Sequence, residues 1–338
     1  MQTVTFSPVV LILGARGRFG LAAARAFVDA GWRVLGQVRP GAQVPAEAAH
    51  MCIEWLPVAL SDTRALAHAA RGAEVVVHAL NPAYTNQAWT ETVLPMTEAA
   101  LALCRALKAT LMVPGNIYNF GKSMPSLLHE DTPQRAQTVK GRIRIVMEDA
   151  IRASEVRAIV IRAGDFFGSG KGSWFDQSMV GRLQKGILTY PGGADVPTAW
   201  AYLPDLARTF AAVAKRRDEL DAFEVLHFGG YRLTGRDWVE ALQPIAQRAG
   251  WVKPGTTLAL RRMPWAVIRM GAWFMPQWAS LMEMQYLWDT PHALDNTKLQ
   301  ALIGQEPHTP LELAAKSALA DLGLLKISAP GLPTRVAA

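Results

Sequence analysis

The sequence predicts an α/β fold in which a doubly wound parallel sheet carries a smaller, mostly helical C-terminal lobe. Three observations predict it. Short apolar runs alternate with amphipathic helical patterns through the first half of the chain, as in parallel sheets covered by helices on both faces. Gly14, Gly17 and Gly20 follow the first apolar run. After Gly164 the alternation gives way to glycine-rich, aromatic and mainly helical sequence.

The expected strands are short runs rich in valine, isoleucine and leucine, as buried parallel strands are. Pro57 weakens the third strand because proline cannot donate to a sheet ladder. The last strand lies far along the chain, and we expect it to return to the sheet. The seven strands are residues 9–14, 32–39, 53–60, 73–80, 110–115, 156–164 and 222–230.

The expected helices show apolar residues at helical spacing between these strands. Gly31 closes the first helix, and Pro95 is expected to break the third. Thr234, as N-cap, and Asp237 form a capping-box pattern before the last. The helices are residues 19–31, 63–72, 90–109, 140–154, 200–216 and 233–250.

The composition indicates a globular enzyme rather than a nucleic-acid binder. Hydrophobic residues make up 50% of the 338 residues and charged residues 19%, which is ordinary for a folded domain. The formal charge is +7 and no long Lys/Arg run occurs. Scattered basic residues favour a small anionic ligand over nucleic acid.

No membrane partner, metal site or disulfide framework is predicted. The apolar stretch 264–288 is interrupted by Arg269, Pro276 and Glu283, so we expect it to be buried or to line a pocket rather than to span a bilayer. The two cysteines and seven histidines lack metal-ligand spacing. We expect both cysteines to be small buried hydrophobes, in a cytoplasmic protein.

The glycine triplet is the strongest functional signal. Gly14 permits a tight turn after the first strand, Gly17 lets the backbone approach a pyrophosphate, and Gly20 lets helix and strand pack closely. This context predicts a Rossmann-type dinucleotide site.

The end of the second strand indicates which dinucleotide. It reads "GQVRP", with Arg39 where an NAD site has a carboxylate, and Arg16 lies in the glycine loop. Two guanidinium groups suit a 2′-phosphate, so we expect NADP(H). An exposed strand-end charge is the other interpretation of Arg39. Asp62 either accepts from the adenine amino group or, with Ser61, caps a helix.

Several motifs together resemble the extended short-chain dehydrogenase/reductases, the NAD-dependent epimerase/dehydratase family. They are the glycine motif, "VVVHALNP", "GNIYNFG", "AYLPDLA" and "PHTPLELAAKSALADLG". The resemblance implies residues 1–170 as a dinucleotide-binding domain, to which 200–230 return, and 171–199 with 231–330 as a substrate lobe. It also implies a homodimer through helices 90–108 and 140–154. The expected cofactor-binding residues are Gly14, Arg16, Gly17, Arg18, Phe19, Gly20, Arg39, Asp62, Ala79, Leu80, Asn81, Lys140 and Ala163.

The family's proton-transfer residues are replaced in this chain. The family pairs a Ser or Thr with a Tyr four residues before a Lys. Lys140 stands in place of that Tyr, Arg144 in place of that Lys, and the strand end "VPGN" has no hydroxyl. Arg144 can hold ribose hydroxyls but stays charged, whereas Lys140 can donate a proton if burial and Arg144 lower its pKa. Tyr118 and Asn116 are alternative catalytic groups. The structural alternative for Lys140 and Arg144 is a solvated helix face, and that for Tyr118 and Asn116 is a turn.

Aromatic residues dominate the expected substrate end. Tyr84, Asp165, Phe166, Trp174 and Trp200 are the candidate substrate-binding residues. They favour an apolar or aromatic carbonyl compound. Asp165 could instead cap the segment after the sixth strand, and the aromatic residues could instead pack in the core. The basic residues available for the diphosphate of a nucleotide sugar are Lys171, Arg182, Lys185 and Arg232.

Three functions follow as hypotheses. The leading one is an NADPH-dependent reductase of a carbonyl or related double bond. The second is a nucleotide-sugar epimerase or dehydratase, and the third is a non-catalytic protein that senses NADP.

Overall fold

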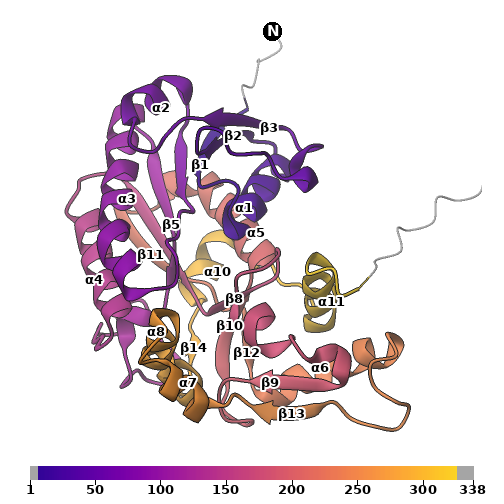
Figure 1. The fold of residues 1–338 in the computed structure, drawn as a ribbon. Helices are drawn as coiled ribbons and strands as arrows, with labels where there is room; N and C mark the ends of the chain where they lie inside the picture. The colour runs from indigo at the N-terminus through magenta and orange to yellow at the C-terminus, as the bar shows by residue number, and fades with distance from the viewer. Residues whose placement is uncertain (1–6, 326–338) are drawn as a thin grey trace, which may run out of the picture.

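The centre of the molecule is one parallel sheet. The computed structural model describes residues 7–325. Seven strands lie in the order β11-β7-β5-β4-β1-β2-β3 (Figure 1). They are β1 (Val9–Leu13), β2 (Arg33–Val38), β3 (Ile53–Pro57), β4 (Val75–His78), β5 (Thr110–Asn116), β7 (Ala158–Ala163) and β11 (Phe223–His227). The predicted doubly wound fold is confirmed, and β11 returns to pair with β7. The chain reverses its winding between β1 and β4, the place where such sheets bind ligands.

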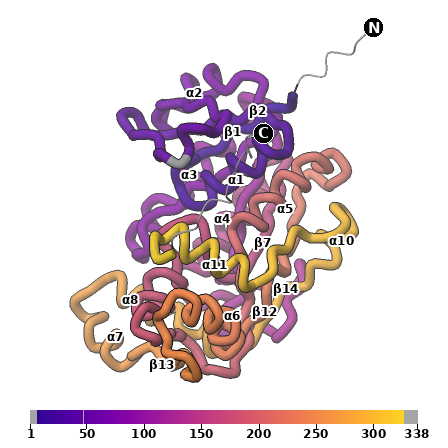
Figure 2. The backbone as a smooth tube through the Cα atoms, turned by 90° about the vertical axis from the view of Figure 1, so that its right-hand side faces the viewer, coloured from indigo at the N-terminus to yellow at the C-terminus, as the bar shows by residue number. Residues whose placement is uncertain are grey.

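Helices cover both faces of the sheet. They are α1 (Arg18–Asp29), α2 (Thr63–Ala69), α3 (Asn86–Leu107), α4 (Val139–Arg152), α5 (Leu203–Lys215) and α10 (Thr297–Ile303). Along β1, Val10 and Ile12 belong to the core under α1 and α5, which lie side by side in Figure 2. Leu11 and Leu13 belong to the core under α2, α3 and α4. Burial on both faces explains the unbroken apolar runs in the sequence.

The expected break near Pro95 does not occur. α3 runs as one helix with Pro95 inside it. Pro95 and Glu91 both lie on the exposed side of α3. The Glu91 carbonyl that loses its intrahelical donor can therefore be hydrated, while Val93 and Thr97 keep the opposite side in the core.

A second core lies beyond the carboxyl ends of the strands. It is built on a three-stranded sheet of β8 (Asp165–Phe167), β10 (Thr198–Tyr202) and β12 (Tyr231–Leu233), and on the pair β9 (Ile187–Tyr190) and β13 (Ala259–Arg262). Its helices are α6 (Gly235–Arg248) and α11 (Leu311–Asp321). The buried residues of α7 (Trp265–Gly271), α8 (Pro276–Met284) and α9 (Tyr286–Asp289) belong instead to the core under α2, α3 and α4. β6 (Leu127–Leu128) pairs with β14 (Ala293–Leu294). The capping box of Thr234 and Asp237 is confirmed at the start of α6.

Two burial predictions need correction. The stretch 264–288 is buried at its two ends, but Trp273 and Phe274, between α7 and α8, are each 88% exposed. They sit in the connection between two short helices, where no other element of residues 7–325 covers them. Cys104 is buried as expected, whereas Cys52 is exposed because it precedes edge strand β3. No helix within residues 7–325 is long and apolar enough to cross a membrane.

Candidate functional site

A cavity of about 420 Å³ lies at the carboxyl ends of β1, β4, β5 and β7. Its walls come from the glycine loop, the segment after β4, the end of β5, α4 and residues 163–177. The predicted residues that it brings together are Gly17, Arg18, Phe19, Ala79, Leu80, Asn81, Tyr84, Asn116, Tyr118, Arg144, Ala163, Asp165, Phe166 and Trp174. The segments that form the walls are far apart in sequence, so the fold assembles the site.

A second hollow, of about 570 Å³, lies at the opposite end of the sheet. Its lining residues precede β4, β5 and β7, and two of them, Glu74 and Arg217, form an ion pair at 2.5 Å. Ligands of open α/β sheets bind outside the carboxyl ends of the strands. The smaller cavity is therefore the candidate site.

The glycine loop forms a backbone cradle at one side of the cavity. Gly14 has a φ of +73°, and a Cβ there would lie 2.9 Å from Leu80 Cδ2. A Cβ on Gly17 would lie 3.2 Å from the Gly14 carbonyl oxygen, and one on Gly20 would collide with the same oxygen. Gly17 caps α1 without a side-chain hydrogen bond. The free N–H groups of this helix start suit a pyrophosphate, so the loop fits a dinucleotide.

Arg18 extends this cradle toward the second core. Its Nη2 donates to the Gly168 carbonyl oxygen at 2.7 Å, while its buried Nε has no partner among the described residues. Burial lowers the pKa of the guanidinium, and Asp176 and Asp321 oppose that effect. An unpaired N–H beside the cradle is a donor for a phosphate oxygen.

At the adenosine end, Arg16 and Arg39 are both exposed. Neither takes part in an ion pair within residues 7–325. Gln37 holds the end of β2 instead of a carboxylate, because its side chain accepts from Gly14 N at 3.1 Å and donates to Val58 O at 2.8 Å. Asp62 caps α2 by accepting from Ala65 N at 2.9 Å. Its contact with adenine stays a prediction.

The structure places Lys140, predicted as a catalytic and cofactor-binding residue, outside the walls of the cavity. Lys140 is fully buried and does not line the cavity. Its Nζ donates to Asn86 Oδ1 at 2.5 Å and lies 4.6 Å from the centre of the Tyr84 ring. Burial lowers its pKa from 10.5 to about 8, and Glu283 opposes that change. Its hydrogen-bond partner belongs to α3, and the carboxylate of Glu283 on α8 acts on it through its charge. Lys140 therefore lies where α3, α4 and α8 meet rather than at the wall of the cavity.

Arg144 does line the cavity. Its guanidinium lies 5.1 Å from the centre of the Trp89 ring, and its buried Nε lacks a partner among the described residues. Burial lowers its pKa, against Glu148 and Tyr118. The predicted role of holding ribose hydroxyls remains compatible with this position.

Sequence reasoning missed His78, the last residue of β4. It lines the cavity, and neither ring nitrogen has a partner within the described residues. Burial, and then Arg144, lower its pKa to about 4, so the ring is neutral at pH 7. A neutral imidazole offers one donor and one acceptor. The only sequence signal was a polar residue closing the run "VVVH".

Two phenols and a carboxyl group form the polar centre of the cavity. The hydroxyl oxygens of Tyr84 and Tyr118 are 3.4 Å apart. Burial raises the pKa of both phenols, and Asp165 also raises that of Tyr118. Asp165 Oδ2 accepts from Trp288 Nε1 at 2.7 Å. Burial raises the pKa of Asp165 from 3.8 to about 7, against this hydrogen bond. Asp165 is therefore the group whose proton exchanges near neutral pH.

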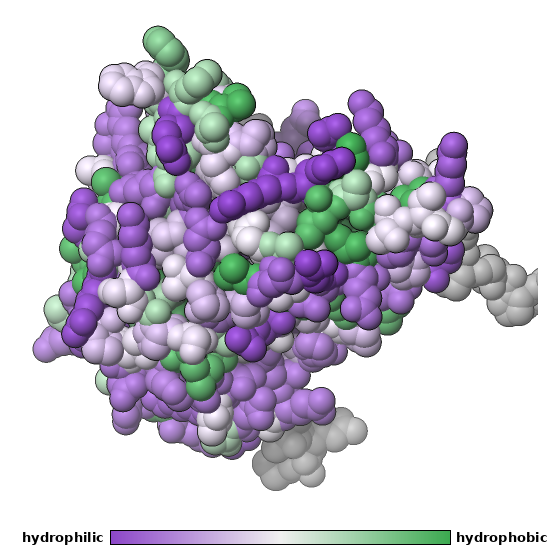
Figure 3. All heavy atoms as spheres, turned by 90° about the horizontal axis from the view of Figure 1, so that it is seen from below, coloured by the Kyte–Doolittle hydropathy of each residue, from purple (hydrophilic) through white to green (hydrophobic). Residues whose placement is uncertain are grey.

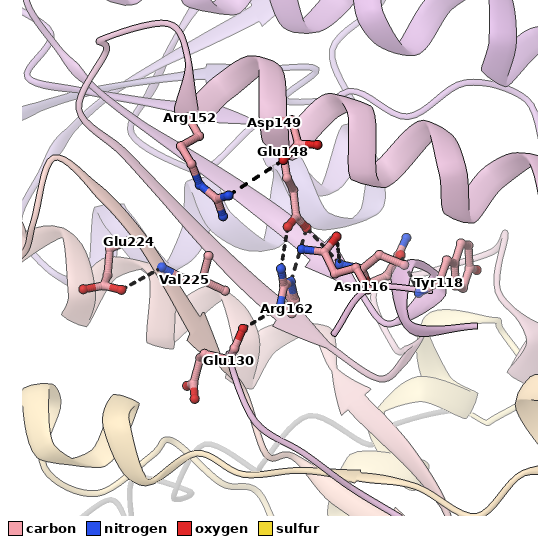
Figure 4. Close-up of polar contacts among 11 residues, drawn as sticks. Asn116, Tyr118, Glu130, Glu148, Asp149, Arg152, Arg162, Glu224 and Val225 are labelled. Carbon is pink, nitrogen blue, oxygen red and sulfur yellow. Dashed lines mark hydrogen bonds and ion pairs between the residues drawn. The ribbon is translucent and has the colours of Figure 1, made fainter. Parts of the chain in front are cut away.

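Asn116 and Tyr118 sit in a turn that a buried ion pair supports. Asn116 Oδ1 accepts from Tyr118 N at 3.1 Å, which closes the turn. Both residues also line the cavity. Beside them, Arg162 Nη2 contacts Glu148 Oε2 at 2.6 Å (Figure 4). The two side chains are 1% and 4% exposed. This pair joins α4 to β7 next to the end of β5.

The structure places Trp200, predicted as a substrate-binding residue, outside the cavity. It is fully buried in β10, where its Nε1 donates to Thr198 Oγ1 at 2.9 Å and its ring packs edge-on against Trp238 at 5.2 Å. It faces the second core because β10 turns alternate residues to opposite sides. Trp174 does reach the cavity, between Tyr84 and Trp288. No cluster of three metal-ligating side chains occurs in the part of the chain that the structure covers.

Comparisons with known proteins agree with this fold. The family model described as the RmlD substrate binding domain matches residues 9–259. A protein from Burkholderia cenocepacia J2315 superposes with a TM-score of 0.72, at 18% identity over 93% of this chain and 97% of that one. The UDP-Glc/GlcNAc 4-epimerase from Campylobacter jejuni superposes with a TM-score of 0.69, at 15% identity over 93% of this chain and 99% of that one. The UDP-glucuronic acid 4-epimerase from Bacillus cereus was solved with UDP-glucuronic acid and NAD. It superposes with a TM-score of 0.69, at 15% identity over 93% of this chain and 98% of that one.

No curated protein sequence matches the chain. The family model spans most of it, including the glycine loop and the walls of the cavity. The chain belongs to the RmlD substrate binding domain family.

Proposed function

We propose that this protein is an NADP(H)-dependent oxidoreductase that interconverts a carbonyl group, or a related double bond, and its reduced form in a small apolar or aromatic substrate. One observation carries the proposal. A carboxyl group with a raised pKa, Asp165, lies in an aromatic cavity that adjoins the dinucleotide cradle. Such a group can take over the proton transfer that the missing Tyr performs elsewhere in the family.

A bound nicotinamide would supply or accept hydride. In the reductive direction, Asp165 donates its proton to the carbonyl oxygen of the substrate and becomes a carboxylate, which solvent then protonates. The Tyr84 and Tyr118 hydroxyls donate hydrogen bonds to the same oxygen as negative charge develops on it. Trp174 and Phe166 contact the apolar part of the substrate, and Arg144 holds ribose hydroxyls. Oxidation follows the reverse order.

The preference for NADP(H) rests on Arg16 and Arg39, which are exposed and free of ion pairs among the described residues. A charge-assisted hydrogen bond contributes about 1.5–3 kcal/mol. We therefore expect Arg39→Ala to weaken NADPH binding about 10-fold to 100-fold and to leave NADH binding unchanged, in fluorescence titrations of both cofactors. Arg71→Ala, an exposed arginine after α2, is the matched control. Equal binding of NADPH and NADH, unchanged by Arg39→Ala, would contradict the 2′-phosphate assignment.

A nucleotide-sugar epimerase or dehydratase is the second candidate. The comparisons favour it, since structures of this fold include a UDP-galactose 4-epimerase and an NDP-hexosamine 5,6-dehydratase. The chemistry of the cavity favours the first candidate, because Lys171, Arg182, Lys185 and Arg232 are exposed and none of them lines it. A diphosphate would meet only Arg18 and Arg144 there.

One assay separates the candidates. The purified protein is given NADPH with a panel of aromatic and aliphatic aldehydes and ketones, and separately UDP-glucose and UDP-N-acetylglucosamine. Net oxidation of NADPH by a carbonyl compound supports the reductase. Conversion of a UDP-sugar without net change in added cofactor supports the epimerase or dehydratase. NADPH binding without either reaction supports a sensor, the third hypothesis. In each case we expect, from the resemblance, a homodimer through α3 and α4.

A further inference from the structure

The connection between α7 and α8 exposes a cluster of apolar side chains. Val267, Met270, Trp273, Phe274 and Met275 are 54%, 70%, 88%, 88% and 42% exposed. We call these five residues the α7–α8 tip. In the space-filling view from below, green, hydrophobic side chains project from the outline of the molecule (Figure 3). Single exposed apolar residues are common, but a projecting group with two aromatic rings marks an interaction surface.

Only basic charges surround this tip in the sequence. Residues 241–282 contain no Asp or Glu, but they include Arg248, Lys253, Arg261, Arg262 and Arg269. Arg261 and Arg262 lie in β13, before the tip, and Arg269 lies in α7 between Val267 and Met270; all three are exposed. Arg262 has a long contact with Asp289, at 3.4 Å. Arg261 and Arg269 form no ion pair within the described residues. These two unpaired arginines leave an excess of positive charge beside the tip.

The tip is held outward by a closed hairpin. Phe274 N and Met275 N both donate to the Gly271 carbonyl oxygen, at 3.0 and 2.9 Å. A Cβ on Gly271 would collide with the ring of Trp278, so the two helices already touch at their closest point. The apolar side chains of the tip cannot fold into that contact.

The base of the hairpin is fixed to the main domain. Ser280 Oγ accepts from Asn86 N at 3.1 Å, and Glu283 accepts from Val139 N at 2.5 Å and from Asn86 Nδ2 at 2.9 Å. These bonds join α8 to the first turns of α3 and α4. The tip therefore projects from a hairpin whose base is anchored on the main domain.

We propose that the α7–α8 tip docks this protein on an anionic lipid surface. Trp273 and Phe274 enter the boundary between headgroups and acyl chains, and Arg261, Arg262 and Arg269 contact lipid phosphates. Exposed aromatic side chains beside arginines are the combination that binds such interfaces. A second copy of this chain fits the tip less well, because a two-fold contact would bring the two arginine sets together. The docking does not depend on the proposed function.

Co-sedimentation with vesicles tests the proposal. The wild-type protein is expected to sediment with vesicles of phosphatidylglycerol and phosphatidylcholine, and at least ten-fold less with phosphatidylcholine alone. Trp273→Ser with Phe274→Ser is expected to reduce binding at least ten-fold. The triple change of Arg261, Arg262 and Arg269 to Gln is expected to reduce it on the order of 100-fold at low salt, at about 1 kcal/mol per charge. Leu313→Ser is the matched control, because Leu313 is 57% exposed on the distant α11.

Circular dichroism and NADPH titration of each variant separate loss of docking from loss of folding, since the tip lies outside the cavity. Equal binding to neutral and anionic vesicles, no binding, or unchanged binding of the double variant would overturn the proposal. Self-association that the tip variants abolish, in the absence of vesicle binding, would assign the tip to a second copy and overturn it as well.

Discussion

Asp165 is a carboxyl group in surroundings that favour its protonated form. Trp288 donates to one of its oxygens, but burial outweighs that bond and raises its pKa from 3.8 to about 7. Two neighbouring phenols, Tyr84 and Tyr118, also stay protonated. The site thus contains one proton that moves near pH 7 and two hydroxyls that donate hydrogen bonds without ionising.

This assignment predicts the pH dependence of stability. Between pH about 4 and about 7, folded Asp165 is protonated while the unfolded carboxyl is ionised, so the folded state binds more protons. Stability conferred by the protonated form is complete below pH 4 and is lost as the pH rises to 7. We expect the thermal midpoint of the wild type, relative to Asp165→Asn, to fall through this range and to level off above it. A constant difference would show that Asp165 has an ordinary pKa.

Lys140 shows how burial can convert an expected acid into a structural group. Its pKa is lowered from 10.5 to about 8, so the unfolded chain binds more protons between these values. Wild-type stability, relative to Lys140→Met, is then largest above pH 10.5 and is lost as the pH falls to 8. Urea unfolding over this range measures the change. Arg142 is an exposed residue of the same helix, so the stability difference between wild type and Arg142→Met should not change with pH. If the difference between wild type and Lys140→Met also stayed constant over this range, the amine of Lys140 would lie in solvent.

The attachment of α4 depends on the buried pair of Glu148 and Arg162. Removing one partner of a buried ion pair leaves the other charge unpaired, at a cost of about 3–5 kcal/mol. We expect Glu148→Gln to lower the free energy of unfolding by about that amount, in urea titrations. Asp149→Asn is the matched control, since Asp149 is 61% exposed and 3.8 Å from Arg152, and it should change stability by less than about 0.5 kcal/mol. Similar effects of the two changes would mean that water reaches Glu148.

Local sequence patterns predicted the elements but not the contacts between distant ones. The strands, α1 and its glycine loop, and the capping box of α6 each follow from residues close together in the chain. Lys140 could not be placed in this way, because its hydrogen-bond partner Asn86 belongs to α3 and the charge of Glu283 that raises its pKa belongs to α8. The bond from Trp288 to Asp165 likewise joins two segments that no local pattern connects. The position of Trp200 could not be predicted for the same reason: its packing against Trp238 of α6 decides which side it faces.

Arg18 connects the two cores of the molecule across the cavity. It starts α1 in the main sheet, and its hydrogen bond ends on Gly168 beyond β8. Residues 168–174 are held by few other bonds, among them Ser169 N to Asp321 and Gly172 N to Asp176. Four residues of this segment have positive φ angles: Gly168, Ser169, Gly170 and Gly172. Such a segment opens locally at low free energy, and Gly172 and Trp174 at its end line the cavity.

A dinucleotide in the cradle would add contacts to Arg18 and to this segment together. Binding to the closed state alone stabilises it by about 2.7 kcal/mol when the ligand is at 100 times its Kd. We therefore expect saturating NADPH to slow amide hydrogen exchange in residues 168–174 about ten-fold or more. Residues 235–248 of α6, which line no part of the cavity, serve as the internal control.

Arg18→Met should remove most of this protection even at NADPH concentrations that saturate the variant, because its hydrogen bond is the direct connection between the cradle and Gly168. Protection that persists in the variant would mean that the cofactor contacts residues 168–174 by itself. Exchange that NADPH leaves unchanged in the wild type would mean that this segment is already closed. The coupling between the two cores would then be built into the fold rather than induced by the cofactor.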